Sequence, residues 1–351
     1  MVNVFEDTSK RIYQNLGNQV DNLSNQTILL TGASGFLGSG MCNFVDYVNK
    51  NKLVSHPIRL IAYDNFLYKK PTWLNELSDN KYISFFEKDI LNIDDYPQSD
   101  FVIHAASVAS PTFYRKYPLE TIDANVVGLR NILNSSLKLR PRSILFFSTS
   151  EVYGDPSIDN IPTKETYFGN VNSFGPRASY DESKRLSETL CYIYFKKYNL
   201  PVKVVRPFNN YGPGLSLNDG RVIPDFFKNI LNKEDINILS DGKATRTFCY
   251  LSDALTGYFL TLFSDFDGEI FNIGSESPEV SMEELADLII KISNSDSKIA
   301  YKKSTDEDYL TNNPSRRCPD ISKASNLLGF TPKVNLEEGL KLTYEYYLQE
   351  F

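Results

Sequence analysis

Residues 27–40 read TILLTGASGFLGSG, a short apolar run that is followed at once by three regularly spaced glycines. An apolar run of this length that ends at glycine is typical of a buried strand. The glycines would let the backbone turn tightly and approach a pyrophosphate, whose charge is stabilised by amides at a helix N-terminus. The pattern is one residue longer in its first interval than G-x-G-x-x-G. We therefore predict a dinucleotide site with contacts from Gly32, Gly35, Phe36, Leu37 and Gly38.

Outward from this stretch, short apolar runs alternate with helical patterns. The predicted strands are 27–30, 59–63, 82–86, 101–104, 143–147 and 202–205, and the predicted helices between them are 36–50, 118–139 and 178–198. Strands that alternate with helices form parallel sheets covered on both faces, so the fold class is α/β. We expect a doubly wound parallel-sheet Rossmann domain over 26–206.

Turn signals become denser after residue 206, and helical patterns return at 281–293 and 336–349. These features predict a smaller C-terminal α/β lobe over 207–351 for the substrate, with 247–274 packing back on the large domain. Residues 1–25 carry apolar side chains at helical spacing, which predicts a helical extension packed on the body. An oligomer contact is the alternative role for that extension.

An acidic residue ends the second predicted strand. The run IRLIAYD stops at Asp64, which lies 26 residues after Gly38. A carboxylate there can accept hydrogen bonds from the adenine ribose and would repel a 2′-phosphate, so NAD is favoured over NADP. A plain turn residue is the alternative interpretation. We expect further cofactor contacts from Asn65, Asp89 and Ile90.

Composition excludes several classes of protein. The chain has 351 residues, of which 41% are hydrophobic and 23% charged, unlike disordered, collagen-like or disulfide-scaffold proteins. A net charge of −7 argues against nucleic acid as a partner. Two histidines and four scattered cysteines predict no metal site. The acidic N-terminus and the lack of a long apolar run predict neither a signal peptide nor a membrane span, so we expect a cytoplasmic protein.

Two further segments indicate catalysis. LFFSTSEVYG ends a predicted strand in Thr149, Ser150 and Glu151, at the sheet edge where ligands bind. SYDESKRLSETL places Tyr180 and Lys184 four residues apart, on one helical face. The lysine and a positive nicotinamide ring would lower the pKa of the phenol and make it a usable base. Alone, this pair would indicate a solvated helical face; beside the glycine motif it predicts an enzyme.

Residues 26–351 resemble the extended short-chain dehydrogenase/reductases that act on nucleotide sugars, and most of all the UDP-glucuronic acid decarboxylases (UDP-xylose synthases). The segments that carry the resemblance are ASVASPTFY (106–114), STSEVYGDP (148–156), GNVNSFGPRASYDESKR (169–185), LNDGRVIPDF (217–226), ATRTFCYLSD (244–253) and RRCPDISKASNLLGFTP (316–332). The 4,6-dehydratases of this family carry aspartate where this chain has Ser150. The 4-epimerases usually lack the glutamate found here as Glu151.

The resemblance implies site residues. Its implied catalytic residues are Thr149, Ser150, Glu151, Tyr180, Lys184 and Arg246, with Lys184 also binding the nicotinamide ribose. Its implied substrate contacts are Pro111, Tyr114, Asn209, Arg221, Asp225 and Arg246. An arginine suits carboxylate recognition because its planar fork can bind bidentately. A structural salt bridge is the other interpretation of Arg246.

The resemblance also implies the reaction: a UDP-sugar substrate, NAD that is recycled, and a 4-keto intermediate that loses CO₂. It further implies a homodimer built from helices 118–139 and 178–198. The sequence departs from the decarboxylase pattern at Gly214, Leu239, Ala244 and the loop NFLYKKP after Asp64. These changes leave the base of the nucleotide open. A 4-epimerase, a variant 4,6-dehydratase and a non-catalytic dinucleotide-binding protein are the alternatives.

Overall fold

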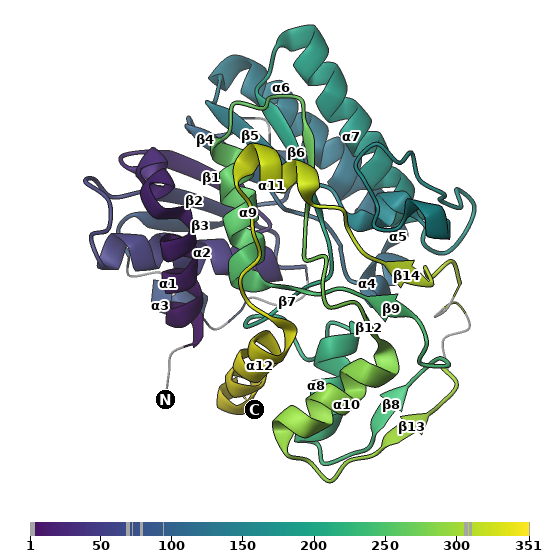
Figure 1. Ribbon diagram of the computed structural model, residues 1–351. Coiled ribbons are helices and arrows are strands. Elements are labelled where there is room, and N and C mark those ends of the chain that lie inside the picture. The colour runs from purple at the N-terminus through teal and green to yellow at the C-terminus, as the bar shows by residue number, and fades with distance from the viewer. Residues whose placement is uncertain are drawn as a thin grey trace.

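The computed structural model describes residues 4–67, 71, 73–77, 80–93, 95–304, 308 and 311–350. Its largest sheet has seven parallel strands in the order β11-β6-β5-β4-β1-β2-β3 (Figure 1). These strands are β1 (Thr27–Thr31), β2 (Arg59–Asp64), β3 (Ile83–Glu87), β4 (Phe101–His104), β5 (Ser143–Phe147), β6 (Val202–Pro207) and β11 (Ile270–Ile273). The strand order reverses between β1 and β4, and α/β sheets bind ligands at the carboxyl ends of the strands at such a point.

Helices cover both faces of this sheet. They are α2 (Phe36–Lys50), α9 (Leu251–Phe263) and α11 (Ser322–Leu328) on one face, and α6 (Leu129–Leu139) and α7 (Ala178–Tyr198) on the other. Successive strand residues point to opposite faces, so Ile28 and Leu30 pack with the first group and Leu29 with the second. A continuous apolar run suits a strand buried on both faces. The predicted doubly wound α/β fold is confirmed.

The predicted helix 118–139 contains a π turn. This turn, η3 (Ala124–Gly128), joins α5 (Pro118–Asp123) to α6. Asn125 lies in it, accepts a hydrogen bond from Ser107 Oγ at 2.7 Å and donates one to Ser183 Oγ at 2.8 Å. These bonds tie the turn to α7 and to the segment after β4.

The smaller lobe has its own apolar core, formed by residues such as Ile223, Leu285 and Leu340. Its helices are α8 (Val222–Leu231), α10 (Met282–Ser293) and α12 (Leu336–Glu350), and its strands are β8 (Ile236–Ile238), β9 (Thr245–Arg246), β12 (Val280–Ser281), β13 (Ile299–Tyr301) and β14 (Arg316–Arg317). β9 pairs with both β12 and β14, so that Arg246 and Arg317 lie in register.

The chain passes between the two parts several times. It leaves the large sheet after β6, pairs β7 (Asn210–Tyr211) with β10 (Cys249–Tyr250), and returns to the large domain for α9 and β11. The structure also places α11 on the large domain, although the sequence analysis assigned these residues to the smaller lobe. The apolar side chains Ile321, Ala324 and Phe330 join the large core there and explain this position.

The remaining elements are short, except for one helix at the N-terminus. The short ones are α3 (Leu74–Leu77), α4 (Pro111–Lys116), and the 3-10 turns η1 (Gly17–Leu23), η2 (Ile90–Asn92), η4 (Ser150–Tyr153) and η5 (Ile158–Asn160). The N-terminal helix, α1 (Val4–Leu16), packs on α2 and α9. Within the described ranges, no helix is both long and apolar enough to cross a membrane.

Candidate active site

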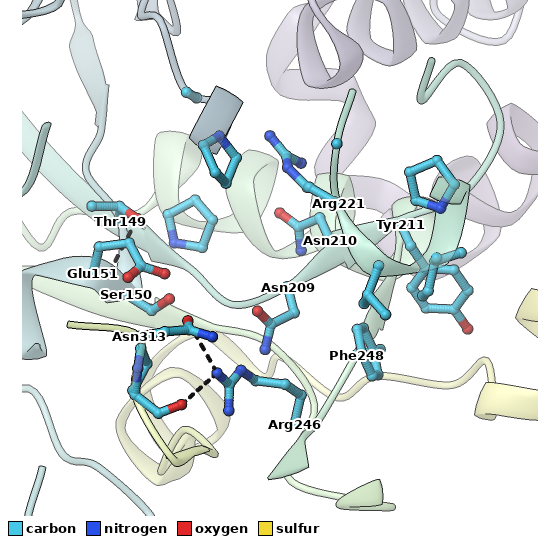
Figure 2. Close-up of a pocket in the computed structure, with 18 of the residues that line it drawn as sticks. Thr149, Ser150, Glu151, Asn209, Asn210, Tyr211, Arg221, Arg246, Phe248 and Asn313 are labelled. Carbon is cyan, nitrogen blue, oxygen red and sulfur yellow. Dashed lines mark hydrogen bonds between the residues drawn. The ribbon is translucent and has the colours of Figure 1, made fainter. Parts of the chain in front are cut away.

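A cavity of about 1480 Å³ lies between the large domain and the smaller lobe. Single small-molecule sites typically measure about 300–1,000 Å³, so this cavity leaves room for a dinucleotide and a second ligand. Figure 2 shows Thr149, Ser150 and Glu151 along one wall, with Arg221 and Arg246 reaching in from the smaller lobe.

The turn after β1 is so tight that side chains do not fit at two of its glycines. A Cβ on Gly38 would lie 2.2 Å from the carbonyl oxygen of Gly32, and a Cβ on Gly32 would lie 2.6 Å from the amide nitrogen of Ala106. Gly35 is the N-cap of α2, and a Cβ there would meet only the Gly32 oxygen, at 3.3 Å. The N-terminus of α2 is thus open towards the cavity, which Phe36 and Leu37 also line. This geometry fits the pyrophosphate of NAD.

Asp64 lies directly beside this turn. Its two carboxylate oxygens accept hydrogen bonds from the backbone amides of Ser34 and Phe66, at 2.9 and 2.8 Å. Each oxygen keeps a second lone pair, so the carboxylate can still accept the hydroxyls of a ribose. Asn65 is bound locally, because its Oδ1 accepts from the Leu67 amide at 3.1 Å. Residues 68–70 of the altered loop lie outside the described residues.

Asp89 and Ile90 lie farther along the same edge of the sheet. Asp89 caps η2 by accepting from the Leu91 amide at 3.0 Å. The Ile90 side chain is buried against Gly128, where a Cβ would approach it to 2.3 Å. A ligand contact from Ile90 would therefore come from its backbone. Asp64 and Asn65, like this pair, lie outside the lining of the main cavity.

Thr149, Tyr180 and Lys184 meet at the carboxyl end of β5. The Tyr180 hydroxyl is hydrogen-bonded to the Thr149 side chain, and Lys184 Nζ donates to the Phe147 carbonyl oxygen at 2.7 Å. Burial lowers the pKa of Lys184 to about 7 and raises the pKa of Tyr180 to about 12. In the chain by itself, burial outweighs the Thr149 hydrogen bond and the Arg221 charge, which both lower this pKa. The lowering predicted for the lysine and a positive nicotinamide ring together stays a prediction. Deprotonating Tyr180 needs a further positive charge nearby.

Tyr114 covers the face of Tyr180. α4 begins at Pro111 and brings the Tyr114 ring to a centroid distance of 4.9 Å from the Tyr180 ring, almost parallel to it. The Tyr114 hydroxyl is buried and has no hydrogen-bond partner within the described part of the chain. Both Pro111 and Tyr114 line the cavity, so this hydroxyl is placed to bind a ligand group.

Glu151 is held by two arginines that the sequence analysis did not single out. Arg177 and Arg317 both donate to Glu151 Oε2, the latter at 3.0 Å. Burial favours the neutral acid, but the charges of Arg317 and Arg177 outweigh it and lower the pKa of Glu151. Arg317 also donates to the backbone carbonyl of Ser150. The position of Arg177, three residues before Tyr180, was a usable signal, whereas Arg317 lies 166 residues from Glu151.

Arg246 is a half-buried cation whose hydrogen bonds, within the described residues, all go to neutral groups. Its guanidinium donates to the carbonyl oxygens of Pro314 at 2.6 Å and Thr245 at 2.7 Å, and more weakly to Ser315 and Asn313 (Figure 2). Burial and the nearby Arg317 lower the pKa of Arg246 to about 10. The described residues give it no carboxylate partner, so the predicted salt-bridge alternative finds no support there.

The other predicted substrate residues line the same cavity. Asn209 adopts a left-handed conformation and donates to the Thr247 carbonyl oxygen at 2.8 Å. Arg221 forms an ion pair of 2.9 Å with Asp219 and remains about one-third exposed. Burial raises the pKa of Asp225 to about 6. Of the two arginines predicted to bind substrate, Arg221 is paired with an acid, and Arg246 has no such ion pair among the described residues.

Two of the three departures from the decarboxylase pattern that the structure describes lie in the cavity wall. Leu239 and Ala244 line the cavity next to β8 and β9. Gly214 lies instead against α1, where a Cβ would be 3.2 Å from the Phe5 ring. An arginine at that position would collide with the N-terminal helix unless the helix moved.

Metal binding has no structural support among the described residues, which contain no group of three or more potential protein ligands. The four cysteines are free and buried.

Comparisons with known proteins agree with this geometry. The sequence profile of the NAD dependent epimerase/dehydratase family matches residues 28–274. UDP-glucuronic acid decarboxylase 6 of Arabidopsis thaliana is 37% identical over 92% of this chain and 89% of its own length. UDP-glucuronic acid decarboxylase 1 of Xenopus tropicalis is 36% identical over 92% of this chain and 72% of its own length.

Solved structures share the fold as well. UDP-glucuronic acid 4-epimerase from Bacillus cereus, in complex with UDP-glucuronic acid and NAD, superimposes with a TM-score of 0.76 at 28% identity, covering 93% of this chain and 100% of the other. UDP-glucose 4-epimerase from Thermotoga maritima gives a TM-score of 0.80 at 28% identity, covering 92% and 99%. The glycine turn, the Tyr180–Lys184 pair and these similarities agree, and the chain belongs to the NAD dependent epimerase/dehydratase family.

Proposed function

We propose that this protein decarboxylates a nucleotide-linked uronic acid, converting UDP-glucuronate to UDP-xylose through a 4-keto intermediate, with NAD recycled. The observation that carries the proposal is Arg246, a half-buried guanidinium that lines the cavity and forms no ion pair with an acid among the described residues. A half-buried guanidinium without an ion pair can bind a carboxylate through charge-assisted hydrogen bonds, and a sugar carboxylate would supply that partner. The names of the curated relatives point to the same substrate.

The first step would remove two hydrogens from the C4 carbinol. Bound NAD would accept the hydride from C4 and later return it to the same carbon. Tyr180 would take the hydroxyl proton, with Thr149 sharing that proton through its hydrogen bond. The pyridinium charge of the cofactor would provide the positive charge that a phenol of pKa about 12 needs.

The second step would break the C5–C6 bond. The C4 ketone is β to the C6 carboxylate, so CO₂ leaves and its bonding electrons form an enolate over C4 and C5. Hydroxyl donors such as Tyr180 and Thr149 would stabilise this charge. A proton from water would then replace the lost carbon at C5, and the returned hydride with the Tyr180 proton would restore the C4 alcohol.

Glu151 and its arginines would organise the carboxylate end of the sugar. Arg246 would bind the carboxylate before it leaves. Glu151, kept ionised by Arg317 and Arg177, would orient the water that protonates C5. Arg221 would contact the diphosphate, because it reaches the cavity and is only partly engaged by Asp219.

We further propose a homodimer that buries the outer faces of α5 and α7. These adjacent elements expose large apolar side chains: Leu119 (71% exposed), Ile122, Leu186, Tyr192 (58%) and Ile193. Several such side chains on one face are typical of a protein interface. Ile193→Glu should convert the dimer to a monomer in light scattering; an unchanged mass for this variant, or a monomeric wild type, would contradict the dimer.

The reaction is tested by incubating the protein with UDP-glucuronate and NAD⁺ and following the sugar nucleotide by mass spectrometry. We expect the loss of the mass of one CO₂, and NMR should identify a xylose product. An unchanged mass with inversion at C4 would indicate a 4-epimerase instead. Tyr180→Phe should lower turnover by at least about 10²-fold while NAD still binds. Full turnover in this variant would overturn the assigned base.

A further inference from the structure

A buried polar cluster lies behind the strand end that carries Thr149. Ser148 Oγ donates to Glu188 Oε1 at 2.5 Å, and Arg206 donates to both oxygens of the same carboxylate, at 2.8 and 2.6 Å. The side chains of Glu188 and Arg206 are only 11% and 9% exposed. Arg206 also donates to the Tyr153 hydroxyl at 2.7 Å. Ser148 is the one member of this group that lines the cavity, so Glu188 does not touch a substrate.

The cluster is connected to the catalytic side chains by two short routes. Ser148 directly precedes Thr149, whose side chain is hydrogen-bonded to Tyr180. Glu188 lies one helical turn after Lys184 on α7, so the two side chains share a face. A single carboxylate is therefore hydrogen-bonded to the residue that follows β5 and lies one helical turn from the lysine.

The charged and titratable groups around Lys184 single out Glu188. From β4, His104 is neutral, because burial and Lys184 itself lower its pKa to about 3. On α7, burial raises the pKa of the Cys191 thiol and keeps it protonated, and Tyr180 has a pKa of about 12. From β6, Arg206 is engaged by Glu188. Burial lowers the pKa of Lys184, and the Cys191 and Glu188 charges oppose this shift. Glu188 is the one of these two that accepts a bidentate pair of hydrogen bonds from an arginine, as a carboxylate does.

We propose that Glu188 is a positioning residue that fixes the end of β5 through Ser148 and supplies a negative charge that favours the protonated form of Lys184. The lysine is then a cation at the moment when Tyr180 must give up its proton. The link to turnover rests on the proposed function. The electrostatic part concerns the chain alone, and it can be measured without any substrate.

The electrostatic part is tested by trace labelling of lysines with acetic anhydride at pH values from about 5 to about 9. Peptide mass spectrometry then gives the titration midpoint of Lys184, which reagent can reach through the cavity. In Glu188→Gln we expect this midpoint to fall by at least about one pH unit. Glu182→Gln, which neutralises a half-exposed carboxylate on the same helix, should leave it unchanged. An unshifted midpoint in a folded Glu188→Gln protein would overturn this role.

The positioning part is tested by Ser148→Ala, which removes the hydrogen bond and no charge. We expect kcat to fall about tenfold with KM unchanged and the Lys184 midpoint at its wild-type value, because one positioning contact is lost. Glu188→Asp keeps the charge but shortens the reach, so it should retain the midpoint and lower kcat. A Ser148→Ala variant with the kcat of wild type would refute the positioning role of the Ser148–Glu188 hydrogen bond, even if Glu188→Gln does not fold. If the wild-type protein did not act on UDP-glucuronate, the proposed function would be refuted instead. The lysine labelling would still decide whether Glu188 shifts the titration of Lys184.

Discussion

The ionisable side chains of this cavity are governed by burial more than by their neighbours. Tyr180 and Lys184 both shift towards their neutral forms, and Arg246 shifts in the same direction. The ion-paired groups are exceptions: Arg317 and Arg177 keep Glu151 ionised, and Glu151 in turn raises the pKa of Arg177. A site of this kind is suited to bind charged ligand groups. Each bound charge favours the ionised form of an oppositely charged side chain, which burial alone disfavours.

Arg246 should discriminate between substrate and product. Arg246→Ala should weaken the binding of UDP-glucuronate by about 10- to 100-fold, which corresponds to about 1.4–2.8 kcal/mol, because a charge-assisted hydrogen-bonded pair is lost. UDP-xylose has no carboxylate, and its affinity should change little. Isothermal titration calorimetry with both nucleotides measures this difference. Arg316→Ala is the matched control, since Glu279 already binds that guanidinium in a bidentate pair. Equal losses for both nucleotides in Arg246→Ala would assign the arginine to the diphosphate.

Asp181 should make stability depend on pH. Burial and the Glu151 charge raise the pKa of Asp181 to about 7, against the opposing charge of Arg177. The folded state therefore binds this proton more tightly than the unfolded chain, whose aspartates titrate near about 3.9. The resulting stabilisation is complete below about pH 4 and is lost as the pH rises through about 7.

We expect Asp181→Asn to remove this dependence. Relative to wild type, its free energy of unfolding should rise by about 3 kcal/mol between about pH 4.5 and about pH 8, measured by urea denaturation. Asp159→Asn, a change at an exposed acid, should follow the wild-type profile. If the free energy of unfolding depended on pH in the same way for Asp181→Asn and wild type, the folded and unfolded states would bind the Asp181 proton equally, which would contradict this prediction.

At the scale of elements, the sequence predicted the features that are formed by residues close together in the chain. The glycine turn, Asp64 and the Tyr180–Lys184 pair each depend on residues close in sequence, and all were named from the sequence. Strand limits were also close, although β3 spans Ile83–Glu87 where 82–86 was predicted. The π turn at 124–128 was not predicted, because its partners Ser107 and Ser183 come from other elements.

The part of the site that the sequence missed depends on tertiary pairing. Arg317 reaches Glu151 only because β14 pairs with β9, a contact that no spacing in the sequence indicates. The assignment of α11 to the smaller lobe failed for the same reason. Its apolar side chains would suit either core, and the choice depends on the path of the chain.

The first turn of α2 provides a test at this scale. Gly38→Ala places a methyl group 2.2 Å from a carbonyl oxygen of the backbone, so we expect a loss of at least about 2 kcal/mol of stability and no NAD binding. Gly35→Ala meets the same oxygen at 3.3 Å, so it should fold nearly normally but bind NAD more weakly. Thermal unfolding and calorimetry separate these effects. Similar unfolding temperatures for the two variants would contradict the steric argument.

At the scale of the whole molecule, α1 touches both parts. Ile12 and Leu16 are buried in the large core. Phe5 meets the Tyr346 ring of α12 edge-on at 5.4 Å, and Arg11 binds Glu338 of the same helix at 2.8 Å. The N-terminal extension therefore connects the Rossmann domain to the smaller lobe, through its contacts with Gly214 and α12.

Phe5→Ala should loosen this connection. We expect a loss of about 1–2 kcal/mol of stability, since Phe5 is only half-buried and a fully buried phenylalanine would cost more. Chemical denaturation measures it, and Lys10→Ala, on the exposed face of α1, is the control. Equal stability in Phe5→Ala and Lys10→Ala would show that the helix end contributes nothing to joining the two parts.

The position of α1 also affects how the protein is made. The apolar face of α1 is synthesised long before α9, against which it packs and which begins only at Leu251. The edge strand β11 and helix α11 follow later still. The nascent chain must therefore carry unburied apolar surface until α9 has been synthesised, and chaperones can bind this surface during that time. Folding of the nucleotide domain can be completed only after translation has passed Phe330.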